Sequence, residues 1–89
     1  KMNDFTFLKT TTSCLQYSKE LLTQAKRSTN SSEYINLLNL MDSVETFIND
    51  SIESGYFVGI ARDELVQAKQ NLVLAKTIVI DRGISANVF

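Results

Sequence analysis

YINLLNLMDSVETFINDSIES, residues 34–54, is the most regular amphipathic segment of this 89-residue chain. Its apolar residues recur every three or four positions, and this spacing keeps them on one face of an α-helix. Asn30 followed by Glu33 resembles a capping box, and Gly55 is a typical helix stop. We therefore predict a helix over about residues 31–54 that packs against two neighbours. Its apolar residues are Tyr34, Leu37, Leu38, Met41, Val44, Phe47, Ile48 and Ile52.

The segment before the central helix repeats its apolar residues every seven positions. One further row contains only small residues, Thr11, Ser18 and Ala25, which would let a neighbouring backbone come close. This pattern predicts a first helix over about residues 4–27. The run TTTS at residues 10–13 forms helix poorly, but the apolar spacing continues through it.

The segment after the central helix predicts a third helix over about residues 59–81. Gly83 is the expected terminator, and the β-branched run at residues 77–80 is the weakest part of this prediction. Small and large residues alternate along one side, which implies close antiparallel packing. That side consists of Ala61, Leu65, Ala68, Leu72, Ala75 and Val79.

Three helices of similar predicted length, each roughly 33 to 36 Å at 1.5 Å per residue, predict an up-down-up arrangement. The chain has no proline and only three glycines, which suits long uninterrupted helices. We therefore expect a single domain over residues 1–89 with an all-α fold. It would be an antiparallel bundle of three long helices, open to completion to four or more helices by a partner or a dimer.

Several function classes are disfavoured by the composition. The net charge is −1, without the basic excess of a general nucleic-acid binder. Histidine is absent, which excludes imidazole-based triads and most zinc sites. Carboxylate pairs such as Asp42 with Glu45 fall on a polar helix face, and Cys14 falls on an apolar one, where an inert buried thiol is expected. We predict a protein that is not an enzyme and uses no cofactor, metal or small-molecule substrate.

The expected location is the cytoplasm. A single cysteine cannot form an internal disulfide, and no apolar run approaches the roughly 20 residues that span a bilayer. Peripheral contact with a membrane remains compatible with this pattern.

Two groups of residues are candidates for binding a partner. Tyr56 and Phe57 lie between Gly55 and Gly59, at the predicted hinge before the third helix. They would either close the end of the bundle or present an aromatic contact, since aromatic residues dominate interface energetics.

The second group is a basic–aliphatic strip along the third helix. One interpretation is intramolecular, with the long basic side chains facing the acidic residues Asp42, Glu45 and Glu53. The other is a face for a partner or a second copy, because Leu74 and Ile78 make the end of this helix apolar almost all round. The strip consists of Arg62, Val66, Lys69, Val73, Lys76 and Ile80.

Residues 5–54 resemble the pediocin-type bacteriocin immunity proteins. The resemblance rests on FLK at residues 7–9 with a following Cys14, on NSSEYI at residues 30–35, and on the pair Leu37 and Leu38. It implies a cytosolic antiparallel four-helix bundle that protects a producing bacterium against its own pore-forming peptide. Such proteins recognise the peptide bound to a sugar-transport receptor, with specificity associated with the C-terminal half. This chain departs from the family in being slightly acidic and in having three predicted long helices.

The resulting hypothesis is a non-enzymatic protein-interaction module, an immunity or inhibitor protein against a bacteriocin-type toxin. Two alternatives stay open. One is a homodimeric structural, secretion-chaperone or assembly subunit, and the other is a phage or plasmid regulator that acts by binding another protein.

Overall fold

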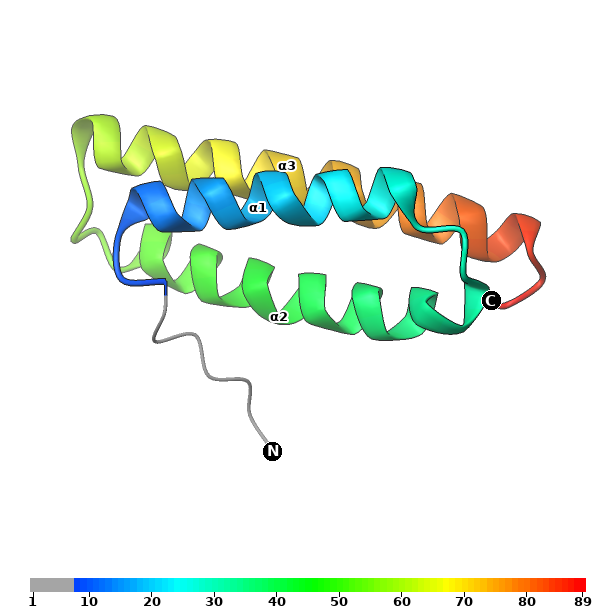
Figure 1. The fold of residues 1–89 in the computed structure, drawn as a ribbon. Helices are drawn as coiled ribbons and strands as arrows, with labels where there is room; N and C mark the ends of the chain where they lie inside the picture. The colour runs from blue at the N-terminus through cyan, green and yellow to red at the C-terminus, as the bar shows by residue number, and fades with distance from the viewer. Residues whose placement is uncertain (1–7) are drawn as a thin grey trace.

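The computed structural model describes residues 8–89 and shows three long helices packed side by side (Figure 1). The second helix runs opposite to the other two, so the first and third point the same way (Figure 1). Residues 8–89 contain no strand. The predicted all-α, up-down-up bundle is therefore confirmed. Its elements are α1 (Thr11–Arg27), the 3₁₀ turn η1 (Ser31–Glu33), α2 (Tyr34–Glu53) and α3 (Gly59–Ser85).

Helix α1 begins later than the sequence predicts. Residues 8–10 are not helical, and the predicted start at residues 4–7 lies outside the described residues. Thr10 is extended, with φ −129° and ψ 159°, and its Oγ1 accepts a hydrogen bond from the Ser13 N–H at 3.0 Å. The threonine-rich run is thus the start of the helix, because a threonine hydroxyl satisfies an N–H that the first turn leaves free.

Helix α2 begins and ends close to the predicted positions. Asn30 Oδ1 accepts from the Ser32 N–H at 3.1 Å, so Asn30 caps the turn η1 that leads into α2. Gly55 follows the helix with φ 73°, a left-handed conformation that glycine adopts without steric cost. The prediction of Gly55 as the stop is confirmed.

Helix α3 passes through Gly83 and ends at Ser85, so the prediction that Gly83 terminates it is wrong. The terminator is Asn87, with φ 59°. The Val88 N–H donates to the Gly83 carbonyl at 2.8 Å and the Asn87 N–H donates to the Ile84 carbonyl at 3.1 Å, which is the pattern of a Schellman motif. Gly83 instead makes room for a ring, because an added Cβ there would overlap Phe89.

The three helices are not of equal length, contrary to the prediction. They have 17, 20 and 27 residues, or about 26, 30 and 41 Å at 1.5 Å per residue. The β-branched run at residues 77–80 stays helical, with Val79 buried in the core and the Thr77 hydroxyl donating to the Val73 carbonyl at 3.0 Å. Burial of the apolar side therefore outweighs the lower helix propensity of the run.

The closest helix pair is α1 with α3. Their backbones come close at more points than those of α2 and α3, whereas the backbones of α1 and α2 come close at few points. The reason lies in small residues on both sides, since Ser18 and Ala25 of α1 and Ala68 and Ala75 of α3 are all fully buried. The small row of α1 acts as predicted. The prediction of close antiparallel packing along the Ala/Leu side of α3 needs correction, because its closest neighbour is parallel to it.

Polar contacts at both ends of α1 favour the parallel orientation of α1 and α3. At the start of α1, Glu64 Oε1 accepts from the Thr11 hydroxyl at 2.8 Å. At its end, the Arg82 guanidinium donates to the carbonyls of Lys26 and Ser28. An acid at the N-terminus and a base at the C-terminus both complement the helix dipole. Because Glu64 and Arg82 are 18 residues apart on α3, this pattern favours the parallel pairing.

One buried polar pair lies midway along the same interface. The Asn71 Nδ2 donates to Ser18 Oγ at 3.1 Å, and the Ser18 hydroxyl donates to the Leu15 carbonyl at 2.6 Å. Ser18 is fully buried, so these bonds remove the penalty of burying a hydroxyl. Sliding α1 along α3 would break the bond between Asn71 and Ser18, which ties the two helices to one register.

Candidate interaction surfaces

The connection between α2 and α3 presents an apolar tip, defined here as Tyr56, Val58 and Ile60. Their side chains are 81%, 73% and 80% exposed, the highest values of any large apolar residue among residues 8–89. Gly55 and Gly59, with φ 73° and 61°, place the chain in left-handed conformations on both sides of this turn. The tip lies at one end of the bundle (Figure 1).

Tyr56 and Phe57 differ in position: Phe57 lies at the end of the bundle core, and Tyr56 is exposed. Phe57 is half-buried and packs against the core, as expected of a residue that closes the end of the bundle. Tyr56 points outward and meets the Phe57 ring edge to face, with 5.1 Å between ring centroids and 86° between planes. Sequence reasoning missed Val58 and Ile60. The eight uncharged residues 54–61 are the signal that could have found them.

Half of the basic–aliphatic strip is exposed, and the other half is half-buried. Val73 is 47% exposed and Ile80 37% exposed, and Arg62 is exposed as well. Val66 and Lys69 are half-buried. The structure thus brings these predicted residues together on one side of α3, away from the core.

Lys76 pairs with acidic residues of α2, as the intramolecular interpretation of the strip predicts. Its Nζ lies 2.6 Å from Asp42 Oδ1 and 2.7 Å from Glu45 Oε1. The hydrogen bonds to Asp42 and then Glu45 raise the pKa of Lys76 above its ordinary value. Within residues 8–89 the close ion pairs are those of Lys76 with Asp42 and Glu45.

A further exposed apolar residue, Leu74, lies on another side of α3. It follows Val73 directly, so the two side chains point about 100° apart around the helix. Ile84 is exposed near the end of α3, while Ile78 is half-buried against the core. The expectation that α3 is apolar on more than one side agrees with these positions.

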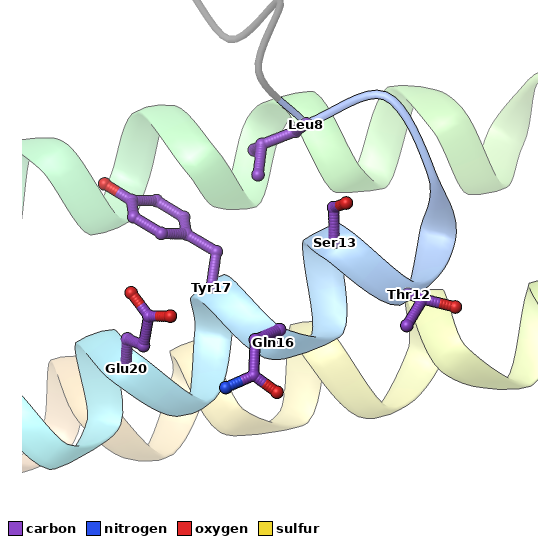
Figure 2. Close-up of a pocket in the computed structure, with 6 residues that line it drawn as sticks. All are labelled: Leu8, Thr12, Ser13, Gln16, Tyr17 and Glu20. Carbon is purple, nitrogen blue, oxygen red and sulfur yellow. The ribbon is translucent and has the colours of Figure 1, made fainter.

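A hollow of about 520 Å³ lies beside the start of α1, where the chain before the helix turns back toward α2 (Figure 2). Buried Leu8 forms one wall, and the Tyr17 ring extends toward α2 from the other (Figure 2). Burial and then the charge of Glu20 raise the pKa of the Tyr17 phenol. The remaining lining residues are the polar Thr12, Ser13 and Gln16.

Two smaller hollows, of about 340 and 230 Å³, continue along α1 toward its other end. Glu20 lines the first two hollows, and Gln24 and Glu33 line the last two, so the three form one shallow groove. The residues that line the groove come mainly from α1, η1 and α2. Amides, hydroxyls and carboxylates line it together with Leu8, Tyr17, Leu37 and Leu40, so its surface is mixed polar and apolar.

The candidate reactive groups of this chain are its one thiol and its carboxylates. Cys14 is buried, and burial raises the pKa of its thiol, which disfavours the reactive thiolate. In the described part of the chain, no group of three or more cysteine or carboxylate side chains converges as a metal site. No helix among residues 8–89 is long and apolar enough to cross a membrane.

Comparison of the sequence and fold with protein-family models, curated proteins and solved structures finds no match for this chain.

Proposed function

We propose that this chain is a non-enzymatic protein-interaction module that works in the cytoplasm as an immunity or inhibitor protein against a bacteriocin-type peptide toxin. The observation that carries the proposal is the exposed aliphatic part of the strip on α3, above all Val73 and Ile80. The resemblance of residues 5–54 to the immunity proteins supports the choice of toxin.

The strip offers a partner both apolar area and charge. Covering Val73 and Ile80 removes apolar surface from water, at about 25 cal/mol per Å². Arg62 and Lys69 lie on the same side, and neither has a close carboxylate among residues 8–89. Lys76, Asp42 and Glu45 form one cluster whose net charge is −1.

The test is protection of living cells. A strain sensitive to pediocin-type bacteriocins would express the full chain and be exposed to a panel of these peptides. We expect at least one peptide to need about a tenfold higher concentration to inhibit growth. Val73→Glu should abolish that protection, because it places a charge in the apolar part of the strip. Protection against none of the peptides would contradict the toxin assignment.

The matched control is Gln67→Glu, which adds the same charge at another exposed position of α3. It should protect as well as the unchanged chain, and both variants should show the same helical circular dichroism. Equal loss of protection in both would show that net charge, and not the strip, is responsible.

A second copy of this chain is the competing occupant of the strip. Light scattering at micromolar concentration distinguishes the two cases. A monomer whose mass does not change in Val73→Glu supports a heterologous partner. A dimer that Val73→Glu dissociates would instead favour the homodimeric structural or chaperone function.

A further inference from the structure

The apolar tip is not explained by folding. Tyr56, Val58 and Ile60 leave 73% to 81% of their surface in water, so their burial contributes little to the stability of the bundle. Scattered exposed apolar residues are ordinary, but here the three most exposed ones of residues 8–89 fall within five positions. From this cluster we infer that the tip inserts into the interfacial region of a lipid bilayer and attaches the protein peripherally to a membrane.

The chemistry of the tip suits that region. Residues 54–61, SGYFVGIA, form an uninterrupted run without charge, and charged side chains are what the apolar part of a bilayer excludes most strongly. Phenylalanine is apolar, whereas tyrosine joins an apolar ring to a polar hydroxyl. Tyrosine is for this reason enriched at membrane–water interfaces. The exposed hydroxyl of Tyr56 could stay at the headgroup level while its ring enters the acyl boundary.

The shape of the tip favours lipid over a protein pocket. The turn projects from one end of a bundle whose longest dimension is 41 Å, and the hollows described above are lined by other residues (Figure 1). A protruding apolar turn needs a matching pocket on a protein, whereas a lipid interface adapts to any protrusion. Insertion of the turn alone also agrees with the lack of a membrane-spanning helix among residues 8–89.

The charges beside the tip indicate which lipid headgroups binding requires. The run is bordered by Glu53 and Arg62, which carry opposite charges. Attraction to anionic headgroups therefore adds little, and the contact depends on apolar area. We expect binding to zwitterionic bilayers that is nearly independent of salt, unlike that of a basic membrane-binding segment.

The chain lacks tryptophan, which allows a direct test. Tyr56→Trp places a single fluorophore on the tip, and Leu74→Trp places one on an exposed part of α3 away from it. With phosphatidylcholine vesicles, the emission of Trp at position 56 should shift to shorter wavelength and become protected from acrylamide quenching. Trp at position 74 should do neither. Vesicles containing phosphatidylglycerol should give the same result.

The unchanged chain provides the second measurement. Its partition into sedimented phosphatidylcholine vesicles should fall about tenfold in the double variant Val58→Ser, Ile60→Ser, because two apolar anchors are lost. Helicity should not change, since both side chains are exposed. Val73→Glu, which tests the proposed function, should partition like the unchanged chain, so failure of one proposal leaves the other standing.

Three results would overturn the inference. The first is no shift at position 56 with either vesicle, which would leave the tip as a knob for a protein pocket. The second is an equal shift at positions 56 and 74, which would mean general adsorption. The third is binding only to anionic vesicles and only at low salt, which would assign the contact to charge elsewhere on the molecule.

Discussion

Gly83 shows how differently one residue can act from what its type suggests. A glycine near the end of a helical pattern predicts a left-handed terminator, yet here it is helical and lies against the Phe89 ring. The left-handed position belongs to Asn87, four residues later. Asparagine is the residue other than glycine that most often adopts this conformation, so its short side chain makes the late ending possible.

The variant Gly83→Ala separates these two roles. In a helical Gly83 the added methyl displaces the Phe89 ring, while the helix gains about 1 kcal/mol of propensity. We expect the free energy of unfolding to change by less than about 1 kcal/mol, because the displaced ring is already half-exposed. Nuclear Overhauser contacts between residues 83 and 89 should disappear. A loss well above that amount, with the contacts retained, would contradict this account.

Thr10 gives a second prediction at the same scale. Removing its hydroxyl in Thr10→Ala leaves the Ser13 N–H without its cap, so urea unfolding should show a loss of about 1 kcal/mol. The matched control is Thr23→Ala at an exposed position within α1, which should be neutral or slightly stabilising. Equal losses in both variants would exclude Thr10 as the cap.

At the scale of elements, the pairing of α1 with α3 rests on contacts at both of its ends. Glu64 and Arg82 lie about five turns apart on α3 and complement opposite ends of the α1 dipole. We expect Glu64→Gln and Arg82→Gln each to lower the free energy of unfolding by about 0.5 to 1.5 kcal/mol.

Because the two sites are far apart, the double variant should show the sum of the single losses to within about 0.5 kcal/mol. Chemical denaturation of all four proteins measures this. A double loss that exceeds the sum clearly would indicate that α1 detaches as one unit once both contacts are gone.

The existence and order of the helices could be predicted from spacing alone, because apolar residues at steps of three and four leave few other solutions. Their ends could not. The start of α1 depends on whether a threonine such as Thr10 caps or continues the helix, and the spacing of Phe7 and Leu8 favoured continuation. The end of α3 depends on contacts of Phe89 that only the folded chain reveals.

The candidate surfaces were predictable to a similar degree. Residues spaced alternately four and three positions apart lie on one side of a helix. This spacing placed Val73 and Ile80 on the same side of α3 correctly. It could not decide whether Lys76 serves a partner or the bundle, because that depends on how α2 is rotated. The distances to Asp42 and Glu45 decide it.

At the scale of the whole molecule, three buried or paired groups make stability fall at alkaline pH. The pKa of Lys76 is raised in the folded state, so its stabilisation is present below the ordinary lysine pKa and is lost as pH rises through the folded one. The raised pKa values of Cys14 and Tyr17 act in the same direction, because the unfolded chain ionises them at lower pH.

The variant Lys76→Met isolates the first of these groups. Below about pH 9 it should be less stable than the unchanged chain by about 0.5 to 1 kcal/mol, a modest value because Asp42 is largely exposed. The difference should shrink as pH rises toward 11, measured as urea midpoints. A difference that stays constant across this range would show that the loss comes from packing of the side chain and not from its charge.

The chain's tightest helix pair joins residues more than fifty positions apart, as in the bond between Thr11 and Glu64. Closing a loop of that length costs about 1.4 kcal/mol more entropy than closing one of ten residues. Sequence-distant contacts slow folding, so this small helical protein should refold more slowly than bundles in which neighbouring helices make the main contact. In kinetic terms, α2 and its flanking turns act as a long tether whose closure is needed before the two parallel helices can meet.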